Sequence, residues 1–169
     1  MEDIVWVHLK EVLERYGDYF CEKARQNLLQ DGSNASGELA QSIVVDKITV
    51  DDASYSVTVS LNDYWYYVEN GRQAGKFPPI SRIEEWVKVK KILPTVYEWG
   101  RKKKTVPTVR QLAFLIARKI AQKGTRGTKF FSRAKEFTME HFADAISYAV
   151  SEDIGEYVRN SLAKEMKTF

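Results

Sequence analysis

Residues 64–86 read Tyr-Trp-Tyr-Tyr-Val-Glu-Asn-Gly-Arg-Gln-Ala-Gly-Lys-Phe-Pro-Pro-Ile-Ser-Arg-Ile-Glu-Glu-Trp, and the rest of the chain is organised around this stretch. It begins with four consecutive aromatic side chains, which cannot all face one way. At helical spacing Tyr64, Tyr67 and Val68 share a face, so Trp65 and Tyr66 are expected to point elsewhere. Some of these rings should therefore meet a second surface.

A loop punctuated by glycine and proline follows, from residue 71 to 79, and a helix is expected after it. Ser81 is the expected N-cap of that helix, with Glu84 three residues on as its capping-box partner. Two interpretations stay open: the stretch packs a core as helix, loop and helix, or its loop is a contact surface. For a contact surface the candidate residues are Trp65, Tyr66, Arg72, Lys76 and Phe77.

The sequence before this stretch predicts a long helix and a β-hairpin. Residues 4–30 repeat apolar side chains at intervals of three and four, which indicates an amphipathic helix that turn residues end at 31–34. Residues 42–50 and 54–61 read as the two strands of the hairpin, and the second alternates apolar and polar side chains cleanly. Asp46 interrupts the first strand, so a β-bulge is possible there.

The sequence after this stretch predicts further helices. The helix from residue 81 runs to about 92 and Pro94 closes it, after which residues 93–107 form a polar connection. Thr108 should cap the next helix and Gly124 should stop it. Phe130 opens a last helical region, with a second short helix expected at residues 154–166.

This order of elements predicts a single α+β domain spanning residues 1–169. Its parts are the N-terminal helix (1–30), the hairpin (42–61), the aromatic, loop and helix stretch (64–92), the basic connection (93–107) and the C-terminal helices (108–169). Because the strands are segregated from the helices, a parallel α/β sheet is not expected. The length of 169 residues agrees with one domain that buries a sizeable core.

The charge is unevenly distributed along the chain. The net charge is only +3, yet residues 100–135 hold 12 lysines and arginines and no acid, whereas the segments before and after are acidic. This block could bind nucleic-acid phosphates or an acidic protein partner, or it could be a solvated face. The block contributes the candidate interface residues Arg101, Lys102, Lys103, Lys104, Arg126 and Lys129.

Catalytic, metal and cofactor sites are not expected. The two histidines, His8 and His141, lie on separate predicted helices without further ligands at metal-binding spacing. Cys21 is expected to be a small buried residue rather than a nucleophile. Residues 71–76 superficially resemble a phosphate-binding loop, but Phe77 stands where a Ser or Thr would hold magnesium.

The compartment is expected to be aqueous. A lone cysteine permits no internal disulfide, which agrees with a reducing environment. The chain opens with acidic residues where a signal peptide would be basic, and no apolar run has the length of a membrane helix. No membrane partner is therefore expected.

Several motifs in this order resemble one family of proteins. Leu-x-x-Ser-Ile occurs at residues 39–43, Tyr-x-x-Tyr-Val-Glu-x-Gly at residues 64–71, and Ile-Ala-Arg-Lys-Ile-Ala-x-x-Gly-Thr at residues 116–125, ahead of Phe130 and Phe131. With the long first helix and the Trp-bearing helix, this resembles the HK97-type tail-completion or neck proteins of tailed bacteriophages and prophages. The resemblance covers nearly the whole chain, except that the basic insert and the acidic C-terminal region are longer than in the common pattern.

The resemblance implies a structural virion protein without catalytic activity or cofactor. Such proteins form a homo-oligomeric ring, of six or twelve copies, at the head–tail junction, and they are assembled in the host cytoplasm. The implied partners are further copies of the chain, the portal or connector protein, and the tail-tube or tail-terminator protein, with DNA in the lumen as a further possibility. The alternative that the residues themselves leave open is a nucleic-acid-binding protein that uses the 100–135 block.

Overall fold

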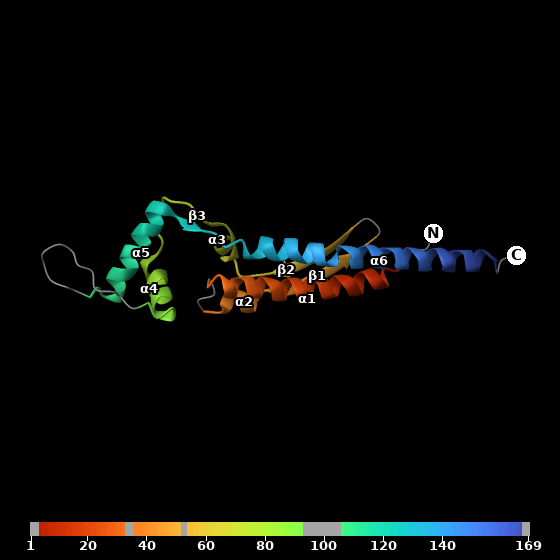
Figure 1. Cartoon of the computed structure of the whole chain (residues 1–169), viewed down its shortest axis with the longest axis horizontal. Coiled ribbons are helices and arrows are strands. Elements are labelled where there is room, and N and C mark those ends of the chain that lie inside the picture. Colours follow the sequence, from red (N-terminus) through yellow and green to blue (C-terminus); the bar gives the residue numbers. More distant parts are fainter. Residues whose placement is uncertain (1–3, 33–35, 52–53, 93–105, 167–169) are drawn as a thin grey trace.

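The computed structural model describes residues 4–32, 36–51, 54–92 and 106–166, and it is an elongated molecule (Figure 1). Two parts follow one another along its length. We call the described residues from 4 to 70 and from 130 to 166 the rod, and the described residues from 71 to 129 the head. The chain passes from rod to head once and returns once, so two crossing segments join the parts.

Two long helices form the rod. The first helix, α1 (Val7–Gln30), buries Leu9, Leu13, Phe20, Ala24 and Leu28, whose spacing of three and four confirms the predicted apolar face. The last helix, α6 (Phe130–Met166), packs along α1, and its C-terminal part extends beyond the N-terminal end of α1 (Figure 1). At 1.5 Å per residue its 37 residues span about 56 Å.

The expected break in the last helical region is absent, because α6 is continuous through residues 154–166. Gly155 is the weakest helix former there, but one glycine costs a helix only about 1 kcal/mol. Neighbouring Asp153 is buried against α1, which fixes the helix directly before that position.

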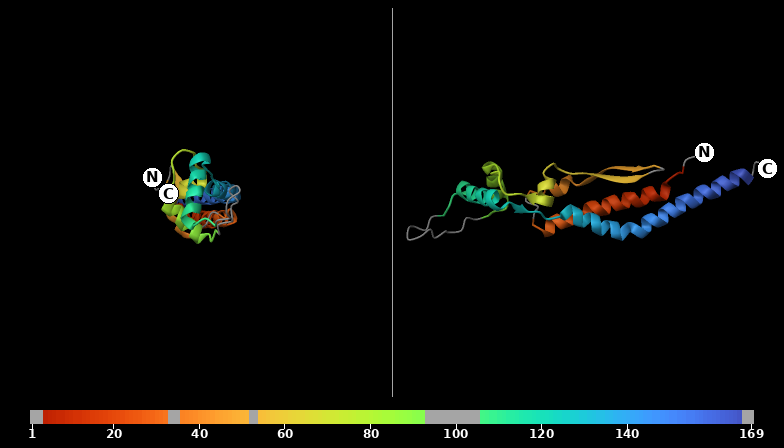
Figure 2. Two further views of the ribbon diagram at one scale, coloured as in Figure 1. Left: turned by 90° about the vertical axis from the view of Figure 1, so that its left-hand side faces the viewer. Right: turned by 90° about the horizontal axis from the view of Figure 1, so that it is seen from above.

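The predicted hairpin is present as β1 (Val44–Val50) and β2 (Tyr55–Ser60), which pair antiparallel. The register shifts between Val45 and Lys47, so Asp46 is unpaired and the expected bulge is confirmed. A short helix that was not predicted, α2 (Glu38–Ser42), leads into β1. Seen from above, α1 lies between the hairpin and α6 (Figure 2).

The hairpin approaches α1 closely at Gly17. A Cβ atom built on Gly17 would lie 2.9 Å from Cγ2 of Val45 and 3.2 Å from Cγ1 of Val57. Gly17 weakens the helix intrinsically, yet its missing side chain lets the sheet pack on the helix. In the rod, buried apolar residues form two clusters, one around Phe20, Leu28, Ile43 and Phe130, and a smaller one around Leu9, Leu13 and Ala149.

The head contains two helices between two very short strands. The chain leaves the rod through α3 (Trp65–Asn70) and β3 (Gly71–Arg72), forms α4 (Ile80–Val89) and α5 (Val109–Lys123), and returns through β4 (Thr125–Arg126). Helices α4 and α5 pack together. The Thr108 hydroxyl accepts a hydrogen bond from the Gln111 N–H in a capping box, and α5 ends at Gly124, so both predicted boundaries are confirmed.

The predicted cap of α4 is wrong, because Ser81 lies inside the helix and Pro79 occupies the N-cap position. Proline is well suited to a helix start, since its fixed φ is compatible with the turn and its missing N–H is not needed there. The helix therefore begins at Ile80 without a side-chain cap. Taken together, a helix, a small antiparallel sheet and further helices confirm the α+β class.

Candidate functional site

The strands β3 and β4 form a joint between head and rod, and the motif residues of the sequence gather there. Gly71 pairs with Arg126, and Arg72 pairs with Thr125. The Arg72 N–H also donates to the Thr125 hydroxyl at 3.0 Å. The motif of residues 64–71 and the motif of residues 116–125 are thus brought side by side by the fold.

Close backbone approach explains the glycines of this joint. Gly71 has φ of +76°, and a Cβ there would lie 2.1 Å from the carbonyl oxygen of Thr125. At Gly124, which ends α5 directly before β4, a Cβ would lie 2.2 Å from the Arg72 carbonyl oxygen. No side chain fits at either position without moving the partner strand.

Glu69 ties the joint to the start of α6. Its carboxylate is buried and accepts hydrogen bonds from the N–H of Phe131 at 2.8 Å and of Ser132 at 3.2 Å. The Ser132 hydroxyl donates to it as well. The glutamate therefore caps a helix that begins some sixty residues later, where a negative charge suits the helix dipole. Glu69 lies in the motif of residues 64–71, where no local pattern indicates this role.

Four of the predicted interface residues surround this joint. Arg72 donates from Nη2 to the carbonyl oxygen of Lys76 at 3.0 Å. Lys129 donates from Nζ to Oδ1 of Asn70 at 2.6 Å, and Arg126 lies exposed on β4. The fold thus places the basic residues Arg72, Lys76, Arg126 and Lys129 around the joint.

The two predicted aromatic interface residues of α3, Trp65 and Tyr66, have different environments. Trp65, a candidate for the contact surface, is partly buried instead, because its ring packs on the core cluster with the Phe131 ring at 5.2 Å. Tyr66 is 57% exposed, but Tyr64 and Tyr67 are exposed as well, while Val68 faces the core. The helix α3 starts at Trp65 and is only six residues long, so its inner face is Trp65 and Val68 rather than the predicted set.

Phe77 lies in the head, where its ring meets Phe114 of α5 at 5.6 Å. Both rings remain 45% exposed, so they form an open aromatic pair beside the basic residues of α5.

The remaining predicted residues, Arg101, Lys102, Lys103 and Lys104, lie outside the described residues.

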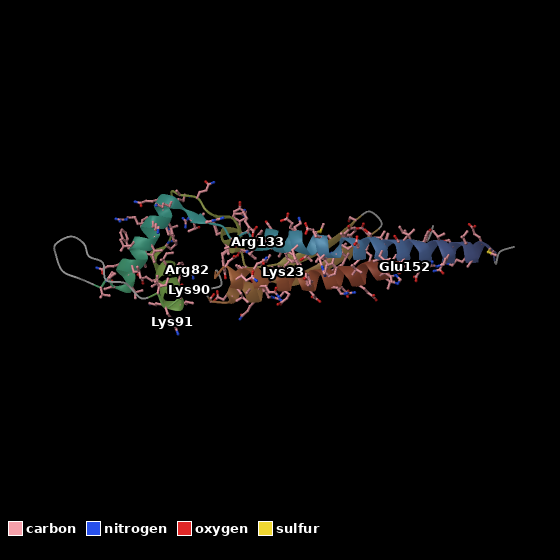
Figure 3. The ribbon with its side chains drawn as sticks, viewed as in Figure 1. Lys23, Arg82, Lys90, Lys91, Arg133 and Glu152 are labelled. Carbon is pink, nitrogen blue, oxygen red and sulfur yellow. The ribbon has the colours of Figure 1, made fainter. Side chains whose placement is uncertain are left out.

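Head and rod have opposite charge. The described head residues include 12 lysines and arginines and 2 acids, a balance of +10. The described rod residues include 9 basic and 17 acidic side chains, a balance of −8. In Figure 3 the labelled Arg82, Lys90 and Lys91 lie on α4 or directly after it, at the other end of the molecule from Glu152 on α6. The molecule is electrically bipolar along its length.

A second helix cap between distant residues lies at the far end of the rod, and no local sequence pattern predicts it. Asp153 of α6 accepts hydrogen bonds from the N–H of His8 at 3.0 Å and of Leu9 at 2.9 Å, in the first turn of α1. Its Oδ1 also lies 2.7 Å from Nδ1 of His8. The only signal for it in the sequence is an acidic residue among the apolar positions of α6.

This contact shifts the pKa values of both partners. Burial by itself would raise the pKa of Asp153, but the hydrogen bonds from Leu9 and His8 hold it below the usual range. The hydrogen bond to Asp153 raises the pKa of His8, aided by the negative charges of Asp153, Glu156 and Glu11. The pair is thus stabilised in its charged form.

Other reactive side chains of the described residues occupy structural positions. Cys21 is buried, as predicted, and burial raises the pKa of its thiol. Glu84 lies 3.9 Å from Arg110 in an ion pair. In the part of the chain that the structure describes, no group of three or more His, Cys, Asp or Glu side chains is arranged to hold a metal ion.

None of the described helices is both long enough and apolar enough to span a membrane, the 37-residue α6 included.

Comparison with known proteins gives one family match. Residues 2–71 match the family model HK97-gp10_like, described as "Bacteriophage HK97-gp10, putative tail-component". No curated protein and no solved structure gives a significant match. A tail component is a structural part of a phage particle, so the match supports a structural protein rather than an enzyme. Over residues 2–71, therefore, the chain is similar to the HK97-gp10-like tail components of bacteriophages, which confirms the HK97-type resemblance that its motifs indicate.

Proposed function

We propose that this protein is a structural component of the head–tail junction of a tailed phage, where its copies form a ring that joins the head connector to the tail. The family match supports the phage tail context. The observation that carries the ring is the bipolar charge, with a balance of +10 on the described head and −8 on the described rod.

Opposite charges at the two ends of one subunit favour head-to-rod contacts between copies. Such a contact uses different patches on the two subunits, so it is heterologous and leaves both patches available again on each new copy. Repetition closes into a ring when the rotation between neighbours divides a full turn. Like-charged ends repel one another, which disfavours head-to-head and rod-to-rod pairing.

The two faces of such a ring offer surfaces for the neighbouring proteins of the particle. We infer that the portal or connector protein binds one face and the tail-tube or tail-terminator protein binds the other. Six or twelve copies would suit those partners. The protein would then be located in the virion, with DNA passing through the lumen.

Negative-stain imaging of the purified full chain tests the proposal. We expect closed rings of uniform diameter, in which elongated subunits repeat around a central opening. Elongated single particles or open filaments, at every concentration used, would contradict a ring-forming junction protein.

A second candidate function rests on the basic residues of α5 and its surroundings. Arg118, Lys119 and Lys123 are exposed there, and residues 106–129 contain no acid. A basic surface of this kind binds duplex phosphates, with an affinity that falls steeply as salt increases. Titration of a duplex with the protein between about 0.05 and 0.2 M salt tests this, and absence of binding at the lowest salt eliminates this function.

A further inference from the structure

The seam between α1 and α6 displays an exposed group of aromatic rings on the acidic rod. Tyr19 of α1 lies over His141 of α6, with ring centroids 5.2 Å apart and planes 16° apart. Phe137 is nearly parallel to both rings, at 6.4 Å from each. Tyr19 is 36% exposed and Phe137 is 44% exposed, so the rings are open to a partner.

Acidic side chains flank these rings on both helices. Glu140 and Asp144 are one turn apart on α6 and lie on the same side of that helix as Phe137 and His141. On α1, Asp18 is adjacent to Tyr19 and is also exposed. Neither Glu140 nor Asp144 forms an ion pair within the described part of the chain. We call this set of Asp18, Tyr19, Phe137, Glu140, His141 and Asp144 the acidic seam.

A cation of the same molecule already lies over one of these rings, which shows that the group attracts cations and that a partner's cation would share or displace it. Nζ of Lys23 lies 4.2 Å from the centroid of the Phe137 ring. Flat aromatic rings beside carboxylates are the surroundings that a guanidinium prefers, because it stacks on the rings and donates hydrogen bonds to the oxygens.

Helix α5 of the head has the complementary surface. Arg118 and Lys119 are exposed near its middle, and Phe114, one turn before Arg118, is 45% exposed. Within one molecule α5 lies in the head, far along the length of the molecule from the middle of α6 (Figure 1). The α5 that meets the seam must therefore belong to another copy.

We propose that the acidic seam is the docking site for α5 of a second copy of this chain, with Arg118 among its rings and carboxylates. This inference rests on the proposed ring and names the two surfaces that form its repeated contact. It requires opposite charge on the seam and on α5, rather than any particular total charge.

Charge reversal on each surface tests the pairing, with native mass spectrometry and circular dichroism as readouts. We expect the seam variant Glu140→Lys/Asp144→Lys and the α5 variant Arg118→Glu/Lys119→Glu to be folded but monomeric. A chain that combines all four substitutions has both charges exchanged, and we expect it to assemble again. Asp46→Lys/Glu165→Lys is the matched control, because it makes the same change in net charge on exposed side chains of the rod away from the seam, and it should leave the oligomer intact.

The outcomes separate this inference from the function on which it rests. If the wild-type chain assembles and the seam variant assembles equally well, the seam is not the interface, although the ring stands. If the control variant dissociates as fully as the seam variant, or the combined variant stays monomeric, the pairing of these two surfaces is wrong. If the wild-type chain itself remains monomeric, the proposed ring and the seam contact both fall.

Discussion

At the residue scale, Asp153 of α6 caps the N-terminus of α1 at the far end of the rod. Helix α1 starts at Val7 without a side-chain cap of its own, so the first N–H groups of the helix need acceptors from elsewhere. Asp153 supplies them from α6, together with a contact to the His8 ring. The same carboxylate therefore caps one helix and fixes its position against another.

Replacing this carboxylate by an amide should destabilise the protein. The amide could accept through only one oxygen and would place an NH2 group against backbone donors, so we expect Asp153→Asn to cost about 1–3 kcal/mol of unfolding free energy. Urea denaturation measures this cost. Glu165→Gln, an exposed change on the same helix, is the control and should change the midpoint little. Equal midpoints for the two variants would show that the cap contributes nothing.

The His8–Asp153 contact also gives a pH dependence with a definite sign. The folded-state pKa of His8 is raised above 6.5, so its contribution is complete below about pH 6.5 and is lost as pH rises through the raised value. The pKa of Asp153 is lowered, so its contribution is complete above about pH 4 and is lost as pH falls through the lowered value. Both contributions are complete together between about pH 4 and pH 6.5.

We therefore expect the wild-type melting temperature to fall as pH is raised from 6 to 8, to the extent that His8 loses its proton. In His8→Gln this fall should be smaller, because the titrating group is gone while backbone capping by Asp153 remains. Differential scanning calorimetry at several pH values compares the two proteins. Parallel curves for both would assign the pH dependence to other groups.

Neither remote cap could be predicted from the sequence. Asp153 and His8 are 145 residues apart, and Glu69 and Ser132 are 63 residues apart. Local patterns specify caps only within one turn, as they do correctly for Thr108 and Gln111. The acids at 69 and 153 acquire their roles from the packing of α6 on the rest of the rod.

At the scale of elements, the β3–β4 joint links head and rod, and its backbone contacts depend on glycine. We expect Gly71→Ala to destabilise the protein by more than the roughly 1 kcal/mol that a left-handed residue costs, since Gly71 has φ of +76° and ψ of −168°, a region that essentially only glycine adopts, and the new Cβ would also collide with the Thr125 carbonyl. Thermal denaturation measures the effect. Gly32→Ala is a matched control, because Gly32 has φ of +63° and no atom within 4 Å of its Cβ position. If both variants lose the same stability, the close approach of the strands is not a constraint.

The elements that local patterns predict correctly are those that their own residues determine. The first helix, the hairpin with its bulge at Asp46, and the boundaries of α5 at Thr108 and Gly124 belong to this class. The errors at Ser81 and Trp65 have tertiary or neighbouring causes: Pro79 takes the N-cap position two residues before Ser81, and Phe131 of α6 packs on the indole. The two-residue strands β3 and β4 give no sequence pattern of their own, because they pair across more than fifty residues.

At the scale of the whole molecule, the family match and the charge belong to different parts. The matched segment, residues 2–71, ends where the chain enters the joint, so it covers α1, the hairpin and α3 but not the head or α6. The positive charge of the head thus lies outside the matched segment. We interpret the matched segment as the shared framework and the head as the part with which this chain makes its own contacts.

Assembly through opposite charges is the central claim, and the native mass of the purified chain as a function of salt tests it most directly. At about 0.05 M salt we expect one dominant oligomer, whose mass is two or more times 19.5 kDa. At about 1 M salt, where screening acts within about 3 Å, we expect that species to dissociate toward the single chain. A mass of 19.5 kDa at every salt concentration would contradict the account, and an oligomer unaffected by salt would show that charge does not hold the copies together.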